Sequence, residues 1–351
     1  MIFEQQNVKD CEKLLLQKNA SFILRHWRTT ARVPVSDVPM ATAQVESKAK
    51  AVLNALSSIS IKKGSSPTEI RALRKLCGNP FDFSALNDVE IRDIVIPVSN
   101  TLLSARIYAA NNTDEPAPCM VFYHGGGFVI GDLDSHDAAC RALSNQADCL
   151  VVAVDYRLAP EHKFPAAVID CEAALKWVAE SASDFGGDRA KIAVGGDSAG
   201  GNLAAAVALL ARDNGGPKLC FQLLIYPCVA PEPETRSHHQ FAEGYLLTRK
   251  TITWFYEQYL RTSKDIRDPR YAPLEADDLS SLPPALVIVA GYDPLRDEGV
   301  DYARALIEAG NQVSLSNYEG MIHGFYLMGA VIDMANKAIE ESVIHLKSAF
   351  K

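Results

Sequence analysis

The residues from 191 to 201 read Lys191-Ile-Ala-Val-Gly-Gly-Asp-Ser198-Ala-Gly-Gly201. The first part is a short apolar run, which is typical of a buried strand. The second part fits G-x-S-x-G, a pattern that places a serine on a strained turn between a strand and a helix. The alanine-rich residues 199–212 supply the helix. This order predicts an α/β fold with the Ser198 hydroxyl at the carboxyl edge of a parallel sheet, where such folds build their sites.

Outward from this stretch, short apolar runs and helical stretches alternate from about residue 85 to the end. Alternation of this kind favours βαβ units and a mostly parallel sheet flanked by helices. We predict eight strands, at 89–98, 102–109, 119–123, 150–154, 192–195, 220–226, 285–290 and 312–317. We predict helices between and after them at 136–146, 165–182, 199–212, 296–309 and 329–349.

Two regions depart from the alternation. Residues 1–84 carry helical patterns only, and residues 229–282 form an insertion too long for a simple connection, which is the usual length of a functional lid. The catalytic core is therefore predicted at 85–228 and 283–351, with the other two regions added to it. The helical patterns in the added regions lie at 11–24, 41–56, 68–76 (with Ser66 as N-cap before Pro67) and, rich in aromatic residues, 251–259.

A glycine run follows the third predicted strand and reads His124-Gly-Gly-Gly-Phe128. Acyl transfer develops an oxyanion, which needs backbone N–H donors without interfering side chains. We expect Gly126 and Gly127 to supply two donors and Ala199, after the serine, a third. A nucleotide site is excluded on detail, because Ile130 stands where G-x-G-x-x-G needs its last glycine and Asn202 where a phosphate-binding loop needs lysine.

An acid and a base follow in the order expected for a serine hydrolase. Asp293 comes directly after the seventh predicted strand, and His323 lies between two glycines after the eighth. The chain order Ser198, Asp293, His323 is that of α/β-hydrolases. Asp297 is the alternative acid, although its place in the first turn of the next helix also suits an acid that interacts with the helix dipole. The remaining histidines are interpreted as structural, with His124 holding the glycine loop.

Together these motifs resemble the hormone-sensitive-lipase family of α/β-hydrolases, also called bacterial family IV esterases. The matching segments are 124–128, 155–161 (Asp-Tyr-Arg-Leu-Ala-Pro-Glu), 196–201, 293–298 and 323–325. The resemblance implies a carboxylesterase that acts on short- to medium-chain acyl esters without a cofactor. It also implies a helical cap made from residues 1–84 and 229–282. Asp155, Arg157 and Glu161 are carried over as structural residues that brace the site.

Composition excludes several other classes. The 351 residues include 35 basic and 43 acidic side chains, a net charge of −8, which is unsuited to nucleic acid or to stable binding on anionic membranes. No apolar run is long enough to span a bilayer, and no metal-binding motif such as H-E-x-x-H occurs. The polar N-terminal residues and eight cysteines without a C-x-x-C pair favour a cytoplasmic location. The resemblance also implies a possible homodimer, because homodimers are common in the hormone-sensitive-lipase family.

Other functions remain open on the sequence alone. An amidase, a lactonase or a lipase would use the same Ser198, His323 and Asp293. A small-ligand receptor on this fold, as in plant gibberellin receptors, is disfavoured because such receptors lose the histidine that stands here at 323.

Overall fold

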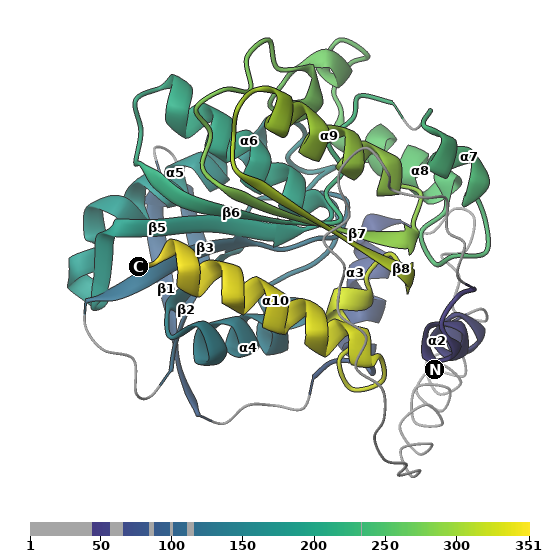
Figure 1. The fold of residues 1–351 in the computed structure, drawn as a ribbon, viewed down its shortest axis with the longest axis horizontal. Coiled ribbons are helices and arrows are strands. Elements are labelled where there is room, and N and C mark those ends of the chain that lie inside the picture. The colour runs from purple at the N-terminus through teal and green to yellow at the C-terminus, as the bar shows by residue number, and fades with distance from the viewer. Residues whose placement is uncertain (1–43, 57–65, 84–87, 99–100, 111–115, 233) are drawn as a thin grey trace.

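The structure, a computed structural model, describes residues 44–56, 66–83, 88–98, 101–110, 116–232 and 234–351. One eight-stranded sheet runs through it in the order β1-β2-β4-β3-β5-β6-β7-β8 (Figure 1). The β1–β2 and β2–β4 pairs are antiparallel, and the other five pairs are parallel. The strands are β1 Val89–Val98, β2 Thr101–Ala110, β3 Ala117–Tyr123, β4 Leu150–Val154, β5 Gly187–Asp197, β6 Leu219–Ile225, β7 Ala285–Tyr292 and β8 Val313–Ile322.

Helices cover both faces of the sheet. Figure 1 shows α4 and α10 on one face and α5, α6 and α9 on the other. Side chains of the buried strand β3 alternate between the two faces: Val121 and Tyr123 belong to the core with α5 and α6, whereas Met120 and Phe122 belong to the core with α4 and α10. These helices are α4 Asp137–Ala147, α5 Ala166–Ser181, α6 Ala199–Asp213, α9 Arg296–Glu308 and α10 Asp333–Ala349.

Four further helices gather on the side of the molecule where β7 and β8 end (Figure 1). Ser66 and Glu69 form the capping box expected at the start of α3, with Pro67 in the first turn. These helices are α2 Ser47–Leu56, α3 Pro67–Cys77, α7 Arg236–Gln240 and α8 Arg249–Tyr259. Short 3₁₀ helices occupy Asp134–His136, Ala182–Phe185, Asp265–Arg267, Pro273–Glu275 and Phe325–Leu327.

The predicted fold class and all eight strands are confirmed, and two helix starts were wrong. Helix α10 begins at Asp333 rather than at 329, because the Ala330 amide donates to the Phe81 carbonyl in a turn. Helix α2 begins at Ser47 rather than at 41, because the Glu46 amide donates to the Gly320 carbonyl and its carboxylate caps the first turn. The helix predicted at 11–24 lies outside the described residues.

Candidate active site

Ser198 occupies a sharp turn between β5 and α6. Its φ of 56° and ψ of −117° lie in a region that costs a non-glycine residue about 1–3 kcal/mol. The turn is held because the Ser198 amide donates to the Ile225 carbonyl at 2.8 Å. It also needs close backbone approach, since a Cβ on Gly200 would lie 1.8 Å from the Tyr123 carbonyl oxygen. The strain therefore presents the Ser198 hydroxyl at the carboxyl edge of the sheet, as G-x-S-x-G predicted.

The predicted acid and base lie beside this serine. His323 Nε2 is 3.0 Å from Ser198 Oγ, and His323 Nδ1 is 2.7 Å from Asp293 Oδ2. Asp293 is fully buried, and its other carboxylate oxygen accepts a hydrogen bond from the Leu295 amide at 2.9 Å. The Tyr226 ring lies against the imidazole, with 4.7 Å between centroids, and limits its rotation.

Asp297, the alternative acid, has other partners. Its carboxylate accepts from the Ser237 amide at 2.8 Å and pairs with Arg296 at 2.8 Å. It therefore ties α7 to the start of α9. The structure brings Asp293, and not Asp297, to His323.

The glycine loop after β3 turns sharply beside the serine. Gly126, Gly127 and Phe128 have φ values of 123°, 61° and 63°, and the amides of residues 129 and 130 both donate to the Gly126 carbonyl. With the residues that the structure describes, the Gly126 and Gly127 amides form no hydrogen bond. Ala199 is the first residue of α6, so its amide has no acceptor within the helix. The Gly125 amide contacts Asp197 Oδ1 at 2.8 Å, so the three donors lie on two turns that touch each other.

His124 anchors the loop from below, as expected. Its ring stacks on Tyr156 with centroids 4.3 Å apart, its Nδ1 lies 2.9 Å from the Gly125 carbonyl oxygen, and the Tyr156 hydroxyl donates to the His124 carbonyl. Burial lowers the pKa of His124 to about 4, so the ring is neutral at physiological pH.

Sequence reasoning missed a second support of the loop, made by Asp197 and His136. Asp197 Oδ1 lies 2.8 Å from the Gly125 amide and 2.9 Å from His136 Nε2. From the sequence, we interpret His136 as one more structural histidine and name no partner for it. Asp197 stands inside the serine motif, and its position before Ser198 is the signal that could have pointed to this pair.

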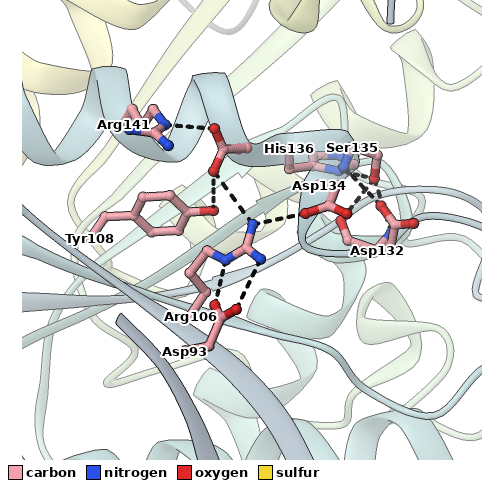
Figure 2. Close-up of polar contacts among 9 residues, drawn as sticks. Asp93, Arg106, Tyr108, Asp132, Asp134, Ser135, His136 and Arg141 are labelled. Atoms are coloured by element: carbon pink, nitrogen blue, oxygen red, sulfur yellow. Dashed lines mark hydrogen bonds and ion pairs between the residues drawn. The ribbon is translucent and has the colours of Figure 1, made fainter. Parts of the chain in front are cut away.

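The segment that carries His136 is fastened to the sheet by Arg106 of β2. The Arg106 guanidinium contacts Asp93 at 2.6 Å, Asp134 at 2.9 Å and Asp137 at 3.5 Å (Figure 2). A cavity of about 380 Å³ lies beside this cluster, and none of the predicted triad or oxyanion residues lines it. The cluster therefore fixes the 132–137 segment rather than forming part of the reacting centre.

Helix α8 of the insertion packs directly on the glycine loop. A Cβ on Gly127 would lie 2.3 Å from ring atoms of Phe255, and Tyr259 stacks on Phe128 with centroids 4.0 Å apart. The Lys163 ammonium donates to the carbonyls of Glu257 and Leu260 and holds the end of the helix. The insertion therefore contributes a wall next to the predicted oxyanion donors.

The residues carried over as structural have structural partners. Arg157 pairs with the buried Asp170 at 2.6 Å, and Glu161 pairs with Arg71 of α3 at 2.9 Å. Asp155 donates its amide to the Ser104 carbonyl. Across the described residues, no three His, Cys, Asp or Glu side chains are grouped so that they could hold a metal ion. None of the helices in the described part of the chain is long and apolar enough to cross a membrane.

Comparisons with known proteins agree with the fold. A family model described as alpha/beta hydrolase fold matches residues 120–327. Carboxylic ester hydrolase LipN of Mycobacterium tuberculosis is 51% identical over 243 residues, which cover 68% of this chain and 64% of that protein. Carboxylesterase NlhH of the same organism is 44% identical over 253 residues, 71% of this chain and 79% of that protein. The solved structure of ester-hydrolase EH1AB1 from the metagenome of Lake Arreo has a TM-score of 0.84 at 37% identity, and the match covers 88% of this chain and 99% of that one.

Relatives this similar extend the comparison from fold to activity, because the named relatives are ester hydrolases. The chain is a carboxylic ester hydrolase that belongs to the hormone-sensitive-lipase family (bacterial family IV) of the α/β-hydrolase superfamily.

Proposed function

We propose that the chain hydrolyses short- to medium-chain acyl esters through an acyl-enzyme intermediate on Ser198. The observation that carries the proposal is the unbroken path from Asp293 Oδ2 through His323 to Ser198 Oγ, with steps of 2.7 and 3.0 Å. Distances of this kind allow His323 to take the serine proton while Asp293 holds the imidazole in the required tautomer.

The proposed reaction has two halves. Ser198 Oγ attacks the ester carbonyl as His323 takes its proton, and the imidazolium then protonates the leaving alcohol. Water, deprotonated by the same histidine, attacks the acyl-enzyme and releases the carboxylic acid. Asp293 is buried, and in such a low-dielectric setting a carboxylate stabilises the His323 imidazolium more strongly than it would in water.

The oxyanion of each tetrahedral intermediate is proposed to bind the amides of Gly126, Gly127 and Ala199. Support comes from the free Gly126 and Gly127 amides and from the position of Ala199 at the start of α6. The loss of one such donor costs about 10²- to 10³-fold in rate.

We further propose that residues 1–84 and 229–282 form one cap over the core. Their described helices support this. Helix α3 donates from Arg71 to the Val129 and Ala159 carbonyls at 2.7 and 2.6 Å, and α8 places Phe255 on Gly127. We expect such a cap to limit the room above Ser198, which would favour small acyl groups.

The test is a set of nitrophenyl esters from acetate to palmitate, with matched amides, on the purified protein. Ser198→Ala is expected to abolish turnover, and activity is expected to peak at short or medium chains and to exceed amidase activity. Ser316→Ala serves as the control and should keep full activity, because it removes a β8 hydroxyl that donates to Glu341 of α10. Retained activity in a folded Ser198→Ala protein would refute the nucleophile, and a preference for palmitate would refute the substrate class.

A further inference from the structure

Asp197 and His136 form a second acid–histidine pair, buried beneath the glycine loop. Their side chains are only 6% and 5% exposed, and Nε2 lies 2.9 Å from Oδ1. The Gly125 amide shares the same carboxylate oxygen at 2.8 Å. Asp197 directly precedes Ser198, so the pair connects the turn that carries the serine to the loop with the free amides.

The hydrogen-bond partners of Ser135 allow the protons on His136 to be assigned. Ser135 Oγ accepts from the Asp132 amide at 2.9 Å and donates its one proton to the Asp132 carbonyl at 2.8 Å (Figure 2). His136 Nδ1 lies 3.0 Å from the same Oγ. We assign the hydroxyl proton to the Asp132 carbonyl, which is the shorter of the two contacts, and on that assignment His136 Nδ1 donates to Ser135 Oγ.

The other ring nitrogen also needs a proton. Without one, the lone pair of His136 Nε2 would face the Asp197 carboxylate oxygen at 2.9 Å, which is repulsive. The Gly125 amide lies 3.2 Å from Nε2 but closer to Asp197 Oδ1, so we assign the carboxylate as its acceptor. Both ring nitrogens therefore donate, which makes the ring an imidazolium.

We propose that His136 is an imidazolium in the resting enzyme and that its buried ion pair with Asp197 positions the oxyanion loop through Gly125. The two side chains are positioning residues, since neither reaches the reacting atoms. The loop part of this inference rests on the proposed oxyanion hole, whereas the protonation part stands on the local geometry alone.

The surroundings of His136 are consistent with a cation. Two carboxylates interact with it: Asp197 from β5 and Asp82 from the segment after α3. The His124 ring, 5.6 Å away, is neutral because burial lowers its pKa. Burial alone would raise the pKa of Asp197, but the charge of His136 and the hydrogen bonds to the carboxylate hold it below its usual value.

The pair also has an electrostatic consequence for the reaction. A bare carboxylate at residue 197, one position before the nucleophile, would oppose the negative charge that develops in the transition state. The positive charge on His136 balances it. Loss of His136 alone should therefore harm catalysis more than loss of both charges together.

The protonation is tested by ¹⁵N NMR on protein labelled at histidine, with the His136 signals assigned from their absence in H136Q. At pH 7 we expect both ring nitrogens to show the shifts of protonated nitrogen. A single protonated nitrogen would overturn the imidazolium. This result does not depend on the proposed function or on whether a variant has activity.

The positioning role is tested by a cycle of H136Q, D197N and the double variant. We expect kcat to fall about 10²-fold in H136Q, at the lower end of the range for a lost oxyanion donor, and about 10-fold in D197N, with KM unchanged in both. The double variant should recover to the level of D197N. Independent, multiplying losses would refute the pair.

A ligand pair separates the oxyanion loop from general structural damage. A trifluoromethyl ketone forms an oxyanion on Ser198, whereas the matching methyl ketone forms far less. Affinity for the fluorinated ketone should fall in parallel with kcat in each variant, while affinity for the methyl ketone stays constant. Equal loss for both ketones would point to a collapsed pocket and overturn the positioning role. If S198A itself retained activity, the proposed function would fail, while the NMR result would still stand.

Discussion

Two acid–histidine pairs lie near Ser198, and they differ in what the second ring nitrogen faces. In the Asp293–His323 pair, the free nitrogen faces the serine hydroxyl at 3.0 Å. In the Asp197–His136 pair, the second nitrogen faces Ser135, whose proton already goes to a carbonyl. The carboxylates are similarly buried, at 0% and 6% exposure.

This difference shows why residue type alone does not define a catalytic pair. A general base needs an unprotonated nitrogen directed at a transferable proton. His323 Nε2 is directed at the Ser198 hydroxyl, as the proposed general base requires, whereas both nitrogens of His136 are proposed to donate, so that His136 can only orient its neighbours. The predictions below separate the pairs, beginning with the largest expected effect.

Asp293→Asn should have the largest effect of any acid substitution. The amide would favour the wrong His323 tautomer, and kcat is expected to fall about 10⁴-fold. Asp297→Asn is the matched control, since its carboxylate binds Ser237 and Arg296, and it should lose less than about 10-fold in kcat. Steady-state kinetics on one nitrophenyl ester measures both. Equal losses would reject the assignment of Asp293 as the acid partner.

Gly127→Ala tests the loop on the side of the second pair. The residue has a φ of 61°, and its Cβ would meet the Phe255 ring at 2.3 Å. We expect a displaced amide and a loss of about 10²- to 10³-fold in kcat. Gly215→Ala is the control, because its φ is 60° but a Cβ would have open space around it. That variant should lose about 1 kcal/mol of stability and no activity.

Most of the fold, and the proximity of the three proposed catalytic residues, were predictable for a physical reason. Ser198, Asp293 and His323 each follow a strand of a parallel sheet, so strand order alone places them at one edge. The glycine run at 124–128 is similarly informative because close backbone approach excludes other residues. Local sequence and sheet geometry thus coincide at the site.

The parts that were missed depend on long-range partners. His136 lies 61 positions before Asp197, and nothing near it in sequence marks it as that residue's partner. The start of α10 is set by a hydrogen bond from Ala330 to Phe81, and the start of α2 by one from Glu46 to Gly320. Periodicity cannot reveal such contacts, because they join segments that are distant in the chain.

Phe255→Ala should alter substrate choice more than chemistry. The Phe255 ring packs on Gly127. The described ring contacts of His323 and His136 include those with Tyr226 and His124, but none with Phe255. Removing it enlarges the site, so we expect the ratio of kcat/KM for octanoate over butyrate esters to rise about 10-fold. Phe185→Ala, on the far side of α5 against Trp177, should leave the ratio unchanged. A uniform loss across chain lengths would mean that Phe255 supports the loop instead.

The smallest expected effect is on stability and comes from Asp82, which faces His136 and not His323. Burial raises the pKa of Asp82 to about 6 from 3.8. The folded protein therefore holds this proton more tightly than the unfolded chain, so stability falls as pH rises from about 4 to about 6 and is level above that. Asp82→Asn removes the cost while keeping an acceptor for the Phe83 amide. Thermal unfolding should show the variant gaining up to roughly 2 kcal/mol on the wild type between pH 4 and 6, with kcat at pH 7 unchanged. A gain that is equal at every pH would contradict the titration of Asp82, because only a group that changes charge in this interval makes the difference depend on pH.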